Sequence, residues 1–223
     1  MPSLSFDQAY AEDRVLEDGT VVHLRLIQPD DKALMLEAWE RLSPESRYRR
    51  FFSAKTALTP DELRYLTELD HVSHLAIGAS CERDGRTVAL GVARFIRLVD
   101  RPEVADAAIT VVDDAQRLGL GRLLLQRLIA AAAERGIERF TCDVLATNDA
   151  MRGLLHSIAP DAIERPDGTT ITIEMPLAGA VIEPDLVDRK SPVYRLLALI
   201  GRGLNAARTT FLDPPSDRPH GGR

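Results

Sequence analysis

Apolar and polar residues alternate in the first regularly patterned part of the chain, residues 19–28. The apolar side chains recur at every second position, which predicts a strand with one buried face; they are Val22, Leu24 and Leu26. Three helix-start signals follow, each combining a proline with capping or acidic residues. They predict helices over residues 31–42, 44–52 and 60–69.

The period changes beyond residue 74. Three strand-like runs come first, with a predicted hairpin turn at Arg83-Asp84-Gly85-Arg86 between the first two; they are residues 74–80, 88–98 and 104–112. Leucines at helical spacing then predict a helix from about 120 to 136. The last predicted elements are a strand over 137–145, a helix over 148–158 and a strand over 169–175. This order, β-ααα-βββ-α-β-α-β, predicts an α/β fold with a mixed central sheet flanked by helices.

The composition divides the chain into three parts. Residues 1–14 are expected to form an N-terminal arm, and residues 15–177 a single α/β domain. Residues 178–223 are expected to contain a linker, an amphipathic helix around 193–204 and a disordered tail. Because glycines interrupt that helix, we expect it to pack on its own domain or on a second copy in a homodimer, and a membrane role is disfavoured.

Charge and composition limit the classes of function. The chain has 223 residues, of which 45% are apolar, and a net charge of -6. An acidic chain is a poor binder of nucleic acid but tolerates a basic substrate such as an amine. The two cysteines, Cys81 and Cys142, lie in strand-like runs and are predicted to be small buried side chains. The N-terminus has no secretory pattern, so a cytoplasmic location is expected.

The segment most informative about chemistry is VVDDAQRLGLGR, residues 111–122, between a predicted strand and a predicted helix. A strand that ends in a glycine-containing loop before a helix presents free backbone N–H groups, which suit phosphate or pyrophosphate. Such glycines often serve only to start a helix. The segment is not a dinucleotide fingerprint, since position 124 is Leu rather than Gly, and it has no Walker lysine.

The spacing Gln116-x-x-Gly119-x-Gly121 after a strand, with Asn148 at the next strand-to-helix junction, resembles the N-acetyltransferases of the GNAT superfamily. The resemblance covers about residues 15–177 and implies the GNAT acyl-CoA N-acyltransferase fold with a C-terminal helical extension. It also implies acetyl-CoA as acyl donor, with its pantetheine arm between two strands that separate, those at 104–112 and 137–145. No metal site is expected.

The resemblance assigns the cofactor contacts by position. Backbone groups at the end of the donor strand are expected to bind pantetheine and to polarise the thioester; they belong to Val111, Val112 and Asp113. The pyrophosphate is expected at the loop and the first helical turn, formed by Gln116, Arg117, Gly119, Leu120, Gly121 and Arg122. Asn148 is expected to hydrogen-bond the cofactor arm.

A narrower resemblance lies upstream. LSPESRYRRFF, residues 42–52, is similar to bacterial protein-lysine acetyltransferases (Pat-like), which carry an acidic general base on the donor strand. Asp106 falls on that position, and being one methylene shorter than the usual glutamate it favours a bridging water. An amine has a pKa near 10.4, so a carboxylate that attracts the ammonium and accepts its proton suits this chemistry. Without the resemblance, Asp106 would be read as a solvated strand residue.

Two further features bear on the acceptor. The superfamily often has a tyrosine acid about seven residues after the asparagine, where this chain has Leu155, with His156 beside it as an ordinary surface histidine. Arg47, Arg49 and Arg50 could line an acceptor pocket, but at this spacing they cannot all point one way. The sequence thus predicts acetyl transfer to an amine, first a protein lysine, with a small-molecule amine acetyltransferase and a non-catalytic acyl-CoA-binding regulator as alternatives.

Overall fold

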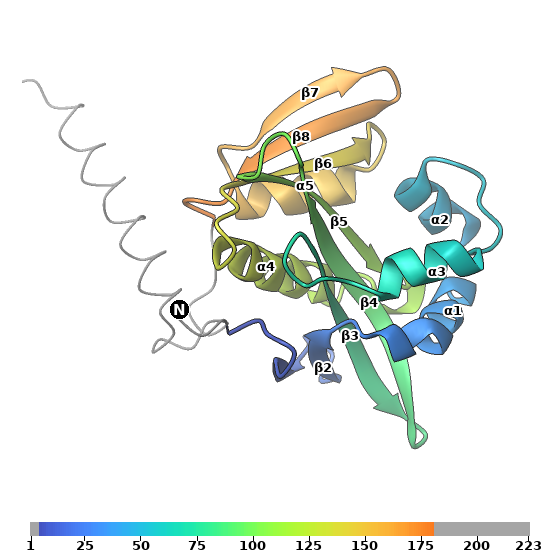
Figure 1. The fold of residues 1–223 in the computed structure, drawn as a ribbon. Coiled ribbons are helices and arrows are strands. Elements are labelled where there is room, and N and C mark those ends of the chain that lie inside the picture. The colour runs from blue at the N-terminus through green and yellow to red at the C-terminus, as the bar shows by residue number, and fades with distance from the viewer. Residues whose placement is uncertain (1–4, 181–223) are drawn as a thin grey trace, which may run out of the picture.

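The computed structural model describes residues 5–180, so the amphipathic helix and tail expected within 181–223 lie outside the described residues. An eight-stranded sheet forms its centre, in the order β1-β2-β3-β4-β5-β6-β8-β7 (Figure 1). Neighbouring strands are antiparallel except for the parallel pair β5–β6. The strands are β1 (Ala11–Val15), β2 (Val21–Leu26), β3 (His74–Arg83), β4 (Arg86–Arg97), β5 (Val104–Val111), β6 (Arg139–Leu145), β7 (Ile163–Asp167) and β8 (Thr170–Pro176).

Helices cover the two faces of this sheet (Figure 1). One face carries α1 (Lys32–Glu40), α2 (Pro44–Phe51) and α3 (Pro60–Thr67), and the other carries α4 (Leu120–Ala133) and α5 (Asp149–Ile158). Two of the three predicted start signals are confirmed: Ser43 accepts a hydrogen bond from the Ser46 N–H to cap α2, and Thr59 forms a capping box with Glu62 at α3. At the start of α1 the Asp31 side chain does not cap the helix and pairs with Arg25 instead. The mixed sheet flanked by helices agrees with the predicted fold class.

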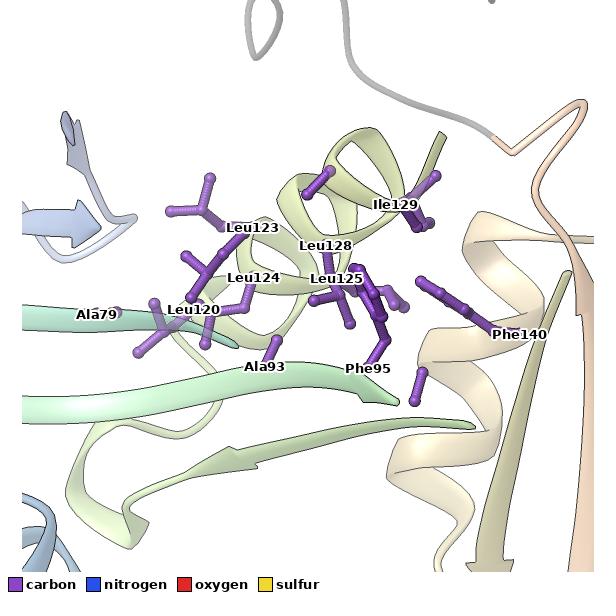
Figure 2. Close-up of a cluster of buried hydrophobic side chains, with 14 of the residues drawn as sticks. Ala79, Ala93, Phe95, Leu120, Leu123, Leu124, Leu125, Leu128, Ile129 and Phe140 are labelled. Carbon is purple, nitrogen blue, oxygen red and sulfur yellow. The ribbon is translucent and has the colours of Figure 1, made fainter. Parts of the chain in front are cut away.

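The helix α4 is the centre of the hydrophobic core. Its sequence LGRLLLQRLIAAAA is apolar nearly all round, as expected for a helix with little exposed surface. Its leucines pack against β3 and β4 (Figure 2), and the labelled residues are Ala79, Ala93, Phe95, Leu120, Leu123, Leu124, Leu125, Leu128, Ile129 and Phe140. Both cysteines are buried and free, as predicted.

Two strands of the structure are absent from the sequence prediction, and both lie at an edge of the sheet. Strand β1 falls within the expected N-terminal arm 1–14, so residues 11–14 belong to the sheet and are not a separate arm. The Glu12 carboxylate binds the Arg127 guanidinium, which lies 1% exposed in α4, and thereby holds β1 to the core. Strand β7 contains Pro166, which an edge strand tolerates because one side of its backbone is unpaired.

Candidate active site

The strands β5 and β6 separate after a short stretch of pairing. Their parallel ladder contains only the pairs Val104–Arg139, Ala105–Phe140 and Asp106–Thr141. On its other side β5 remains paired with β4 up to Gly91–Val111. The backbone of residues 107–111 therefore has a partner on one edge and a gap on the other.

The backbone groups that face this gap follow from the alternation along a strand. The Val112 N–H donates to Leu90 O (2.9 Å) on the β4 side. Consecutive residues of a strand direct their backbone groups to opposite edges, so those of Ala107, Ile109 and Val111 are directed toward the gap. The Ala107 N–H is directed at the Cys142 thiol, and the Val111 carbonyl accepts from Gln116 Nε2 (3.2 Å). Among residues 5–180 the Ile109 backbone groups have no strand partner on this edge, which suits an extended ligand inserted like an additional strand.

The loop after β5 presents further unpaired N–H groups. In the part of the chain that the structure describes, the backbone N–H groups of residues 117–122 have no hydrogen-bond partner, and the first helical bond joins Leu123 N–H to Gly119 O. Arg117 and Gly119 both have left-handed backbone, with φ of 64° and 81°. Such kinked loops direct successive N–H groups into one concave surface at the positive end of a helix. The geometry suits a pyrophosphate.

The predicted loop residues differ in their surroundings. Gly121 faces Leu154, and a Cβ added there would lie 3.5 Å from Leu154 Cδ2, an ordinary contact. The Leu120 side chain is buried in the core, so only its backbone is available to a ligand. Arg122 donates to Ser157 Oγ (2.9 Å). One carboxylate is also near: an added Cβ at Gly119 would lie 3.4 Å from Glu17 Oε1.

The start of the loop is hydrogen-bonded to the beginning of α2. Asp113 accepts hydrogen bonds from the Ser43 N–H (2.7 Å) and from the Ser46 hydroxyl (2.7 Å). Burial raises the pKa of Asp113, but these hydrogen bonds outweigh it and hold the pKa below the ordinary value. Asp114 forms ion pairs with Arg41 and Arg83 at 2.6 Å and 2.9 Å. These contacts fix the end of β5 relative to α2.

Three predicted residues lie between β6 and α5 or within α5. Asn148 caps α5, its Oδ1 accepting from the Met151 N–H (3.3 Å), which leaves its amide NH2 as donor toward a ligand. Leu155 is buried in the core (1% exposed), so this position supplies no acid to the gap. His156 pairs with Glu164 (Nε2–Oε1 2.9 Å) away from the core, as expected of a surface histidine.

Asp106 lies where β5 and β6 separate. Its cross-strand partner Thr141 donates a side-chain hydrogen bond to its carboxylate. Asp106 is exposed, on the sheet face opposite the core residues Ala105 and Ala107, and it shares that face with Ala108 and Thr110. On the core side, burial raises the pKa of Cys142 to about 12, so this thiol is no nucleophile.

The sequence did not indicate the contacts that hold this site together. Ser43 and Ser46 are 70 and 67 positions from Asp113, and Thr141 is 35 positions from Asp106, so no local pattern reveals them. Among residues 5–180, no group of three or more His, Cys, Asp or Glu residues is arranged to hold a metal ion. No helix in that range is both long enough and apolar enough to cross a bilayer.

Comparisons with known proteins give relatives that are named acetyltransferases. A protein of Mycolicibacterium smegmatis named acetyltransferase Pat is 32% identical over 77% of this chain, and the chain spans about half of it (51%). An acetyltransferase of Pseudomonas aeruginosa is 29% identical over 71% of this chain and 84% of its own length.

Among solved structures, the GNAT domain of the S. lividans protein PAT superposes with a TM-score of 0.69 at 26% identity, covering 77% of this chain and 99% of that domain. An 18% identical protein of Salmonella typhimurium, solved with acetyl-CoA, shares the fold with a TM-score of 0.56 over 73% of this chain and 97% of its own. The profile of the acetyltransferase (GNAT) family matches residues 34–158, more than half of the sequence. This chain belongs to the acetyltransferase (GNAT) family.

Proposed function

We propose that this chain is an N-acetyltransferase that uses acetyl-CoA and transfers its acetyl group directly to a primary amine, in the first place the side chain of a protein lysine. One observation carries the proposal: the gap between β5 and β6 begins at Asp106 and opens toward the loop of free N–H groups at residues 117–122. A thioester ligand with a pyrophosphate at one end fits both features. Bound there, acetyl-CoA supplies an acetyl group activated as a thioester.

The residues of the chain divide the binding between them. The backbone from Arg117 to Arg122 would hold the pyrophosphate, with Gly119 and Gly121 keeping side chains away. Backbone groups of Ile109 and Val111 would bind the pantetheine arm, and the Asn148 amide would bind it from the opposite side of the gap. Val112 and Asp113 turn the chain into the loop, and Gln116 ties that loop to the end of β5.

The distance along β5 bears on which N–H polarises the thioester. Val111 is five residues from Asp106, or about 16 Å at the rise of a strand, whereas Ile109 is three residues away, or about 10 Å. One amine must reach both the carbonyl carbon and the base, so we assign the thioester oxygen to the Ile109 N–H rather than to Val111. This donor stabilises the negative charge that develops on the oxygen during attack.

Asp106 then serves as general base. Its carboxylate attracts the acceptor ammonium and takes its proton, directly or through one water, and Thr141 holds the carboxylate in place. The nitrogen bonds to the carbonyl carbon as the bond to sulfur breaks. Thiols have a pKa near 8.5, so the thiolate leaves without an acid, which is consistent with the buried Leu155.

The choice of a protein lysine rests on two observations. The relative from M. smegmatis and the S. lividans domain are both named Pat or PAT. In addition, among residues 5–180 no helix lies over the face of β6 and β8 beside Asp106, where the Asp143 carboxylate is exposed and Glu174 pairs with Arg165 (Figure 1). A small-molecule amine and a non-catalytic acyl-CoA-binding role stay as alternatives, and a homodimer and a cytoplasmic location stay predictions of the sequence.

The first experiment is calorimetry of acetyl-CoA binding with two variants at one position. Gly121→Ala adds a methyl group in ordinary contact with Leu154 and should bind as the wild type does. Gly121→Glu brings a carboxylate to the anion site and should weaken binding on the order of 100-fold. No binding to folded wild-type protein, or equal binding by both variants, would contradict the assignment of the loop.

The acceptor is then identified by transfer assays. Protein substrates and small primary amines are offered with acetyl-CoA, and the rate of thiol release is measured. Faster transfer to proteins supports the lysine proposal, and faster transfer to small amines supports the first alternative. Tight acetyl-CoA binding without transfer to either class would favour the regulator.

A further inference from the structure

A cavity lies between the helices α1–α3 and the sheet, on the same face as Asp106. Its walls are mainly apolar and include Trp39, Leu42, Phe51, Leu66, Val92 and Ala108. Thr110 also lines it, so its floor includes the strand that carries the proposed base. The cavity is therefore placed to receive part of a substrate whose reacting atoms lie at β5.

Two arginines with no carboxylate partner face this apolar cavity, Arg50 from α2 and Arg94 from β4. Arg94 is 4% exposed, and its contacts are uncharged: Nη2 donates to Leu66 O (3.2 Å), and Nη1 lies 3.2 Å from His74 Nε2. Arg50 lies over the Phe51 ring, 5.1 Å from its centroid. Within residues 5–180, neither guanidinium is in an ion pair.

The other ionisable groups around the cavity do not neutralise these charges. Arg25 and Asp31 line it too, but they form an ion pair with each other at 2.5 Å. Burial lowers the pKa of His74 to about 4, so its ring is neutral at pH 7. Burial, and then the nearby charge of Arg50, lower the pKa of Arg94 to about 9, and at neutral pH it still carries its proton. The cavity thus holds two cationic groups and no free anion.

Buried charge without a partner is unfavourable, and a ligand anion would remove the penalty. We propose that Arg50 and Arg94 bind a carboxylate of the substrate. A planar guanidinium matches a carboxylate with two parallel hydrogen bonds, and the apolar walls strengthen the attraction by excluding water. Arg94 pairs across the sheet with Ala108, two residues from Asp106, which places its Cβ about 7–8 Å from that of Asp106.

This proposal deepens the proposed acetyl transfer and rests on it for the identity of the substrate. The carboxylate can come from the acceptor, as in an amino acid, a peptide end or an acidic side chain next to the acceptor lysine. It can also come from a dicarboxylic acyl group on the donor. Both sources bring the same chemistry to the cavity, and the assays below separate them.

The first test measures carboxylate binding without any turnover. Trp39 lines the cavity and is the sole tryptophan of the chain, so its fluorescence reports on occupancy. Glutarate, titrated to tens of millimolar, should change the fluorescence, and the uncharged glutaramide should not. Arg50→Gln and Arg94→Gln should weaken glutarate binding about 10–100-fold.

Arg49→Gln is the matched control, because Arg49 neighbours Arg50 on α2 but pairs with Glu45 at 2.5 Å on the exposed side. It should bind glutarate as the wild type does. Arg50 is only half-buried, so Arg50→Gln keeps the test valid if the Arg94 variant does not fold. No fluorescence response to glutarate, an equal response to glutaramide, or wild-type affinity in Arg50→Gln would overturn the proposal.

The second test identifies the source of the carboxylate. Nα-acetyl-lysine is compared with its carboxamide as acceptor, and succinyl-CoA with butyryl-CoA as donor. A preference of about tenfold or more for the charged member of one pair, lost in Arg50→Gln but kept in Arg49→Gln, assigns the carboxylate to that substrate. If acetyl-CoA binds and acetyl transfer proceeds while glutarate does not bind, the carboxylate assignment fails and the acetyltransferase proposal stands.

Discussion

The two halves of the sheet, on either side of the gap between β5 and β6, differ on the face that carries Asp106. On β2–β5 this face is covered by α1–α3 and encloses a cavity lined by the buried Arg94 and the half-buried Arg50. Among residues 5–180 no helix lies over the same face of β6 and β8, where Asp143 is exposed and Glu174 pairs with Arg165 (Figure 1). We propose that a cationic amine approaches over the open half and that the covered half binds a carboxylate.

We propose that the two halves, which meet at β5, bind different parts of one substrate. In the described part of the chain no helix covers the open half, which leaves room there for a large acceptor such as a protein. The covered half is enclosed and selects for one chemical group. Asp106 stands at the boundary, where both halves can contribute to the orientation of one substrate.

The largest effect is expected from removing the boundary carboxylate. Asp106→Asn keeps the shape and the bond from Thr141 but cannot accept a proton, so kcat should fall about 10²–10⁴-fold while acetyl-CoA affinity stays constant. The loss should be greatest at low pH, where least of the amine is neutral. Steady-state kinetics across pH and calorimetry measure the two quantities.

Asp143→Asn is the control for this change. Asp143 lies on the same face and accepts from Thr172 Oγ1 (2.7 Å), but it is on the β6 side of the gap. It should alter kcat only a few-fold. Similar losses in the two variants would show that the charge of the face, and not a base at one position, drives the reaction.

The second effect compares packing in the core under α4, on the opposite face of the sheet, with packing at the sheet edge. Leu124 is fully buried between α4 and β4 (Figure 2), so Leu124→Ala should lower the free energy of unfolding by about 2–5 kcal/mol. Ile163 on the edge strand β7 is 55% exposed, and Ile163→Ala should change it by less than about 0.5 kcal/mol. Denaturant unfolding measures both, and equal losses would remove the distinction between the core and the edge of the sheet.

The difference between the buried centre and the edges of the sheet also explains how much of the fold could be predicted from the sequence. The strands and helices at the centre could be predicted from the spacing of their apolar residues, because side chains such as Leu24 and Leu124 point into the buried core. The edges did not follow. Strand β1, AEDRV, has no apolar alternation, and Glu12 is held by Arg127, 115 positions away.

The features of the candidate site likewise differ in whether the sequence could predict them. The spacing of Gln116, Gly119 and Gly121 indicated the anion loop, because its chemistry is local to one segment. The separation of β5 from β6 came only from the family resemblance, since no residue pattern states where a ladder stops. Of the three neighbouring arginines of α2, the structure places Arg50 at the cavity and Arg49 on the outside. Arg94, which lines the same cavity, is 44 positions from Arg50 in the sequence.

A third and smaller effect tests the charge of the covered half. The pKa of His74 is about 4 in the folded protein, lowered by burial and by Arg94, against about 6.5 in an unfolded chain. A lowered folded-state pKa contributes stability above the unfolded pKa, and that contribution is lost as the pH falls from about 6.5 to 4. The Tm should therefore drop over this window.

The variant His74→Gln keeps an acceptor for Arg94 but has no proton to gain, so its Tm should depend less on pH in that range. His71, whose pKa is also lowered, contributes in the same direction in both proteins and leaves part of the slope. Parallel Tm curves for the wild type and the variant would show that the pKa of His74 is not lowered in the folded protein.

The smallest effect tests how the covered half holds the cofactor loop. Ser43→Ala and Thr59→Ala each remove a helix N-cap and should each cost about 1 kcal/mol of unfolding free energy. Of these two capping residues, Ser43 but not Thr59 also donates to Asp113 (Oγ–Oδ1 3.0 Å). Ser43→Ala alone should therefore raise the KM for acetyl-CoA, by a few-fold. If both variants left the KM unchanged, the anion loop would keep its shape without α2, and the two halves would be coupled through the sheet alone.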